Sequence, residues 1–219
     1  MPQTSPFTRE TSIPLQEWER EDKVNLEVVT YGWEGTKCTI RFYLPMERDK
    51  QRLHDMTRNL IRDVKHSRDW MCEFCGRIAR ETQVMTLTWT HLSPPRMAIF
   101  IHHICNHDRQ ECFAELEEHH YAIKMLNNLP QTPLPRPRRK RPGDRHPRAS
   151  SCAGCQKDAT SSMELQRCSR CKLTRYCGTE CQRDDWKRHK QTCSQIYSVL
   201  FEGWDDRDAA PQVQQLEQA

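Results

Sequence analysis

Long apolar runs are missing from this sequence, and glycine is scarce. No window approaches 18 consecutive apolar residues, so we expect no transmembrane helix. Residues 1–10 offer neither a basic region nor an apolar stretch, so we expect no signal peptide. A net charge of only +4 does not by itself favour a nucleic-acid partner. With 29% charged and 36% hydrophobic residues, the chain is expected to have modest cores and some disordered length.

Cysteine, by contrast, is abundant, with 12 residues in 219. Without a secretory signal the thiols are expected to stay reduced, and clustered CxxC pairs are then typical of metal sites rather than disulfides. A secreted disulfide scaffold is the disfavoured alternative. Cys38 stands alone in a predicted strand, where we expect it to act as a small buried hydrophobe.

The predicted fold class is α+β, with a small N-terminal domain, a Pro/Arg-rich linker and a C-terminal zinc module. Alternating β-forming residues predict strands over 24–31, 37–44, 84–90 and 97–104, and apolar periodicity predicts helices over 47–69 and 113–126. The expected segments are a disordered arm (1–22), an α+β domain with a zinc site (23–128), a basic proline-rich linker (129–150), a zinc finger (151–195), and a short helix with a polar tail (196–219).

Eight soft metal ligands follow the linker with the spacing C-x2-C-x12-C-x2-C-x5-C-x3-C-x7-H-x3-C. They are Cys152, Cys155, Cys168, Cys171, Cys177, Cys181, His189 and Cys193. Eight ligands fill two closed tetrahedral zinc sites and leave no open position for catalysis. So short a segment cannot fold on a hydrophobic core alone, and each structural zinc contributes on the order of 10–16 kcal/mol of folding free energy.

This spacing, with Arg175-Tyr176-Cys177 and Cys181-Gln182-x3-Trp186-x2-His189, resembles the MYND zinc finger. The resemblance covers about a fifth of the chain. It implies interleaved pairing of the ligands. One zinc would be held by Cys152, Cys155, Cys177 and Cys181, and the other by Cys168, Cys171, His189 and Cys193.

The resemblance also implies a peptide-binding surface. MYND fingers typically bind short proline-containing peptides, and in the Nervy-like transcriptional co-repressors the peptide adds as a strand and packs on a tryptophan. The matching residues here are Ser169, Gln182 and Trp186, with 174–176 as the edge strand. An exposed indole stacks on proline, while Gln and Ser supply hydrogen bonds. The alternatives are that Trp186 is a core residue covering the second zinc, and that Ser169 and Gln182 are ordinary solvated side chains.

A third zinc site is expected in the N-terminal domain, formed by Cys72, Cys75, Cys105 and Cys112. A glycine directly after the first pair is typical of zinc knuckles. His102, His103 and His107 are substitute ligands, although Cys105 is preferred. The alternative is four buried, reduced cysteines. This region loosely resembles the N-terminal part of some fungal MYND-finger proteins, and the resemblance implies no activity.

The sequence carries no recognisable catalytic motif. Some MYND fingers are inserted in SET-domain lysine methyltransferases, but the Asn-His-Ser-x-x-Pro-Asn segment of that domain is absent, and Asn106-His107-Asp108 only echoes it. The Walker loop and the GxGxxG, GxSxG and HExxH motifs are also absent. We therefore predict that the chain is not an enzyme and has no catalytic residues.

The linker carries seven cations: Arg136, Arg138, Arg139, Lys140, Arg141, Arg145 and Arg148. Such a run is a nuclear-import signal, a phosphate-binding patch or a self-repelling linker.

The predicted function is a zinc-binding adaptor that docks proline-containing peptides of other proteins in transcriptional regulation. We expect it in the nucleus or cytoplasm, with the nucleus favoured, and not in a membrane. A flexible linker would let the two domains sample many separations. The alternative is a nucleic-acid-associated factor that uses residues 136–148 for electrostatic contact.

Overall fold

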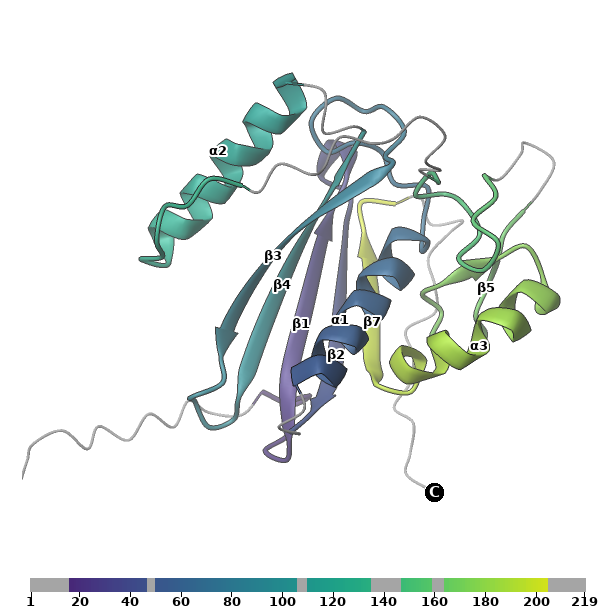
Figure 1. Cartoon of the computed structure of the whole chain (residues 1–219), viewed down its shortest axis with the longest axis horizontal. Coiled ribbons are helices and arrows are strands. Elements are labelled where there is room, and N and C mark those ends of the chain that lie inside the picture. The colour runs from purple at the N-terminus through teal and green to yellow at the C-terminus, as the bar shows by residue number, and fades with distance from the viewer. Residues whose placement is uncertain (1–15, 47–49, 106–109, 135–146, 159–163, 205–219) are drawn as a thin grey trace, which may run out of the picture.

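The computed structural model describes residues 16–46, 50–105, 110–134, 147–158 and 164–204, and its α+β class confirms the prediction. Five strands form a mixed sheet in the order β3-β4-β1-β2-β7 (Figure 1). These strands are β1 (Lys23–Tyr31), β2 (Lys37–Pro45), β3 (Glu81–Trp89), β4 (Arg96–Ile104) and β7 (Ile196–Glu202). The helices are η1 (Trp33–Gly35), α1 (Lys50–Lys65), α2 (Gln110–Leu126) and α3 (Thr179–Cys193), and a small ribbon joins β5 (Gln166–Arg167) to β6 (Arg175–Tyr176).

Period-two burial places the main core between the sheet and α1. Val28 on β1 lies opposite Ile40 of antiparallel β2 and Ile99 of parallel β4, and all three are fully buried. Helix α1 adds Leu60 and Val64 to the same core. The sequence therefore predicted the strands β1, β2, β3 and β4 and the apolar face of α1. The helix ends at Lys65, before the predicted end at residue 69, and residues 47–49 of the predicted range lie outside the described residues. None of the helices in the described part of the chain has the length and apolar character that crossing a bilayer requires.

Strand β7 corrects the prediction for the segment after Cys193. The sequence favoured a short helix there, but residues 196–202 pair antiparallel with β2, with Val199 opposite Ile40. The strand occupies the edge of β2 that β1 leaves unpaired, and hydrogen bonding along that edge outweighs local helix continuation. Residues 205–219, the rest of the predicted tail, lie outside the described residues.

Two other segments are more ordered than the sequence predicted. In the predicted arm, Trp18 is buried beside Tyr43, and Glu19 accepts hydrogen bonds from Arg96 at 2.5 and 2.7 Å. At the end of the predicted linker, the buried Ala149 donates its N–H to the carbonyl oxygen of Ala79 at 2.9 Å. Residues 1–15 and 135–146 lie outside the described residues.

The C-terminal zinc module contacts α1 directly, and Figure 1 shows α3 beside α1. Arg62 donates to the carbonyl oxygen of Ala153 at 2.6 Å, and the backbone N–H of Arg175 donates to the carbonyl oxygen of His66 at 3.1 Å. The Arg175 side chain also donates to Asp69 at 2.6 Å. The expectation that the two parts sample many separations is therefore wrong: the module is bound to the N-terminal domain through α1.

Candidate metal centres and peptide surface

All three CxxC pairs adopt the same tight turn. The residue after each pair has a left-handed backbone, with φ of +63° at Gly76, +57° at Gln156 and +56° at Lys172. Its N–H donates to the carbonyl oxygen of the first cysteine of the pair at 2.9–3.0 Å. Glycine adopts this conformation without steric cost, so the other two residues hold it against their own preference. The repeated turn brings the two sulfurs of each pair toward one point.

The first centre in the module gathers sulfur atoms from Cys152, Cys155, Cys177 and Cys181, all within 4.8 Å of one another. Tetrahedral zinc with Zn–S bonds of about 2.3 Å requires sulfur atoms ~3.8 Å apart. The Cys155 and Cys177 sulfurs are 3.5 Å apart. Burial opposes ionisation of Cys152, but backbone N–H groups of Cys155 and Cys177 outweigh it and lower the pKa of the thiol. Four cysteine sulfurs at these separations match the ligand set of a structural zinc site.

The second centre combines Cys168, Cys171, His189 and Cys193, again within 4.8 Å of one another. The Cys168 and Cys193 sulfurs are 3.9 Å apart, and Nε2 of His189 lies 3.6 Å from the Cys171 sulfur. Hydrogen bonds from Cys171 and Cys193 hold the pKa of Cys168 far below its usual range. His189 and Cys193 share one face of α3 because they are four residues apart. The structure thus groups the eight ligands in the two interleaved sets that the resemblance implies.

A third centre lies in the N-terminal domain, where Cys72, Cys75, Cys105 and Cys112 gather within 4.8 Å. The Cys105 sulfur is 3.7 Å from that of Cys75 and 3.8 Å from that of Cys112, close to the tetrahedral separation. Burial opposes ionisation of Cys75, yet backbone and thiol hydrogen bonds lower its pKa to about 7. The cluster joins the CxxC turn after α1 (residues 72–76, the knuckle) to the end of β4 and the first turn of α2.

The substitute histidines are not part of that cluster. His102 is buried and its Nδ1 lies 2.7 Å from a carboxylate oxygen of Glu73, while His103 stacks on Trp70 with ring centroids 4.5 Å apart. His107 lies outside the described residues. Glu73, His102 and His119 form a further close group of ligand-type side chains, in which the hydrogen bond between Glu73 and His102 is the shortest contact.

The residues expected to contact a peptide surround the second centre. Trp186 is 39% exposed on α3, with its ring 6.1 Å from that of His189, so it is not a core residue. Ser169 is exposed, and Gln182 is half-buried. The side-chain amide of Gln182 donates to the Cys168 sulfur at 3.4 Å, so its first role is to support a metal ligand.

The predicted edge strand is not available for strand addition. Arg175 is the middle residue of 174–176, and its N–H donates to the carbonyl oxygen of His66 while its carbonyl oxygen accepts from Ala153. On the other side, β6 pairs with β5. Both edges of this short strand are therefore occupied, and the sequence could not show this because one partner lies on the chain about a hundred residues earlier.

A buried charge network that the sequence analysis missed joins α1 to α3. Asp63 is fully buried and accepts hydrogen bonds from His189, Arg188 and Thr192. Burial alone would raise the pKa of Asp63, but His189 and Arg188 outweigh it and lower the pKa. Arg188 also pairs with Asp185. The signal in the sequence is an acidic residue, Asp63, directly before the apolar core position Val64 of α1.

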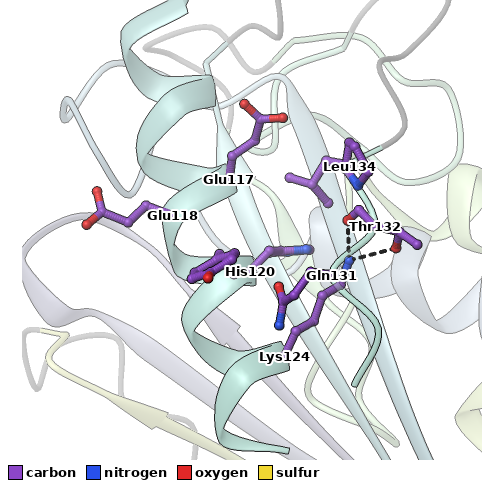
Figure 2. A pocket seen from close by; sticks show the side chains of 9 residues that line it. Glu117, Glu118, His120, Lys124, Gln131, Thr132 and Leu134 are labelled. Carbon is purple, nitrogen blue, oxygen red and sulfur yellow. Dashed lines mark hydrogen bonds between the residues drawn. The ribbon is translucent and has the colours of Figure 1, made fainter. Parts of the chain in front are cut away.

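A surface cavity of about 360 Å³ lies between α2 and residues 131–134, remote in the sequence from the module. Figure 2 shows Lys124 reaching across to Thr132, to which it donates hydrogen bonds at 2.6 and 3.0 Å. Glu117 and Glu118 also line the cavity. No motif pointed to this site.

Of the seven cations in the basic run, Arg148 contacts Asp158, and the other six lie outside the described residues. The role of the basic run therefore stays a prediction.

Comparison with known proteins supports the finger and little else. Residues 152–193 match the family model of the MYND finger, which confirms the resemblance and the zinc cofactor. SET domain-containing protein 14 of Caenorhabditis elegans is 50% identical over 42 residues, which is 19% of this chain and 10% of that protein. An F-box protein of Arabidopsis thaliana is 44% identical over 57 residues (26% and 15%), and the N-lysine methyltransferase SMYD2 of Homo sapiens is 41% identical over 51 residues (23% and 12%). No solved structure matches the chain.

These relatives contradict the prediction that the chain is not an enzyme. Several of them are named N-lysine methyltransferases or SET-domain proteins, so a MYND finger occurs in catalytic proteins. The prediction relied on the absence of known catalytic motifs from this chain, and such an absence does not exclude catalysis. The similarity is confined to the MYND segment and spans at most 15% of the relatives named above, so it shows no enzymatic activity here either.

Proposed function

We propose that this chain, whose residues 152–193 are a MYND-type zinc finger, docks a proline-containing segment of a partner protein beside Trp186. A MYND finger is a zinc-binding protein–protein interaction module, and the observation that carries the finer proposal is the 39% exposed indole of Trp186. An exposed indole offers a large rigid apolar surface on which a proline ring packs at little entropic cost.

The neighbouring groups support the same surface. Ser169 is exposed in the loop between two ligands of the second centre and can donate or accept a hydrogen bond. Gln182 donates its amide to Cys168, which leaves its carboxamide oxygen to accept from a peptide N–H. Since β6 is occupied on both edges, the peptide would lie across α3 rather than extend that ribbon.

We propose that the twelve ligands of the three centres hold three structural zinc ions. Two close the finger, and the third fixes the knuckle to β4 and α2. Each set has four ligands and leaves no open coordination position, which is typical of structural zinc. The protein would then present two zinc-stabilised surfaces in a fixed arrangement, as an adaptor in transcription by analogy with the co-repressors that share the finger.

Peptide binding is tested with Trp186→Ala in the full chain against a library of proline-containing peptides. Loss of a central tryptophan typically costs about 2 kcal/mol or more, so we expect affinity to fall roughly 30-fold or more. Trp33→Ala is the matched control, because Trp33 is 37% exposed and lies on η1 in the N-terminal domain. Fluorescence polarisation at 50 and 200 mM salt measures the affinities.

An apolar docking surface predicts little change with salt, whereas phosphate-type contacts weaken steeply over that range. Unchanged peptide affinity in Trp186→Ala would exclude this surface. The same variant, tethered to DNA beside a reporter gene, tests the transcriptional part of the proposal: it should lose any effect that the unaltered chain and Trp33→Ala share.

A further inference from the structure

Asp63 places a buried carboxylate of the N-terminal domain against the finger. It lies on α1, is fully buried, and accepts from three donors on α3. The distances are 3.0 Å to Nδ1 of His189, 2.5 Å to Oγ1 of Thr192 and 2.7 Å to the guanidinium of Arg188. A buried carboxylate is costly unless it is paired and hydrogen-bonded, and these contacts satisfy it.

His189 connects this carboxylate to the second zinc centre. Its Nδ1 faces Asp63, while its Nε2 faces the cluster and lies 3.6 Å from the Cys171 sulfur. A neutral imidazole carries one proton, and a carboxylate at one nitrogen holds the proton there. Nε2 is then left with a free lone pair on the side of the three cysteine sulfurs, and this is the form of the imidazole that binds zinc.

We propose that Asp63 is a positioning residue for the second zinc centre, holding His189 in the tautomer and orientation that bind the metal. The finger's ligand pattern is complete within residues 152–193, but this outer partner is supplied by α1, 126 residues before His189. Zinc affinity at this centre therefore depends on the folded N-terminal domain. The inference goes beyond peptide docking and rests on the second centre alone.

The test compares Asp63→Asn with Asp69→Asn in the full chain. The first substitution retains the shape of the side chain but removes its charge, whereas Asp69 also contacts the finger, through Arg175, without touching a ligand. Zinc transfer to a chromogenic chelator should show one zinc equivalent held 10–100-fold more weakly in Asp63→Asn, with the other equivalents and the Asp69→Asn variant unchanged. Equal weakening of all equivalents would indicate general destabilisation and overturn the proposal, as would no weakening.

Two spectroscopic measurements separate positioning from a merely structural role. In the cobalt-substituted protein, the d–d bands of the centre with three cysteines and one histidine differ from those of the two all-cysteine centres, so they identify which centre Asp63→Asn weakens. In the unaltered zinc-loaded chain, a long-range proton–nitrogen spectrum should place the His189 proton on Nδ1. A proton on Nε2 would overturn the proposal even if the variant failed to fold.

Discussion

At the scale of single residues, the ligands of the finger could be read from the sequence because their spacing is local. Each CxxC turn needs only five residues, and His189 and Cys193 need only one turn of α3. Asp63 could not be read in this way, because its role depends on a contact with a helix 126 residues further along the chain. Local patterns therefore identified the ligands but not the group that orients one of them.

His103 offers a residue-scale prediction. It is fully buried against Trp70, neither ring nitrogen has a hydrogen-bond partner within the described structure, and burial holds its pKa well below the usual 6.5. We expect His103→Phe to keep the stacking and to raise the unfolding free energy at pH 7.5 by about 1–3 kcal/mol, because it removes unpaired buried polar atoms.

The pH dependence follows from the same lowered pKa. Above pH ~6.5 the imidazole is neutral in both states; below it the unfolded chain binds a proton that the folded chain does not. The contribution of His103 to the unfolding free energy therefore falls by up to about 1.4 kcal/mol per pH unit as the pH drops from ~6.5 toward its folded-state pKa. Urea unfolding at pH 7.5 and 5.5, with zinc in excess, should show that the unfolding free energy falls less in His103→Phe than in the unaltered protein. An equal loss in both proteins would contradict this assignment.

At the scale of elements, the sheet was predictable where its strands alternate and pair locally. β1 and β2 form a hairpin with a clear period of two, and α1 shows one apolar face. β7 was not predictable, because the ligand-bearing helix before it favoured helical continuation and its partner is the distant edge of β2. The second face of α1, which carries Arg62 and Asp63, was also hidden, since polar helix residues ordinarily face solvent.

Alternation along β7 gives a matched pair of variants. Val199 is 6% exposed and Leu200 is 46% exposed, so neighbouring positions face opposite ways. We expect Val199→Ala to cost about 2 kcal/mol, since it removes two buried methyl groups, and Leu200→Ala to change stability by about 0.5 kcal/mol or less. Equilibrium unfolding measures both. Equal effects would indicate that β7 does not join the sheet with this register.

At the scale of the whole molecule, the finger and the N-terminal domain share one packed arrangement. The main core includes Leu60 and Val64 of α1 together with Tyr176 of the finger. The ring of Phe201 on β7 is near two guanidinium groups, with its centroid 4.5 Å from that of Arg68 and 5.3 Å from that of Arg167. The chain enters the finger after the N-terminal domain and returns to the sheet through β7, so the finger is held at both ends. This fixed placement brings Asp63 to His189.

The most direct test of this account is the number of zinc ions bound to the full chain, measured by native mass spectrometry. The three clusters predict three zinc ions per chain, two in the finger and one at Cys72, Cys75, Cys105 and Cys112. Two ions would contradict the N-terminal centre and leave those four cysteines as reduced core residues. Fewer than two would contradict the zinc finger itself, and with it the docking surface beside Trp186.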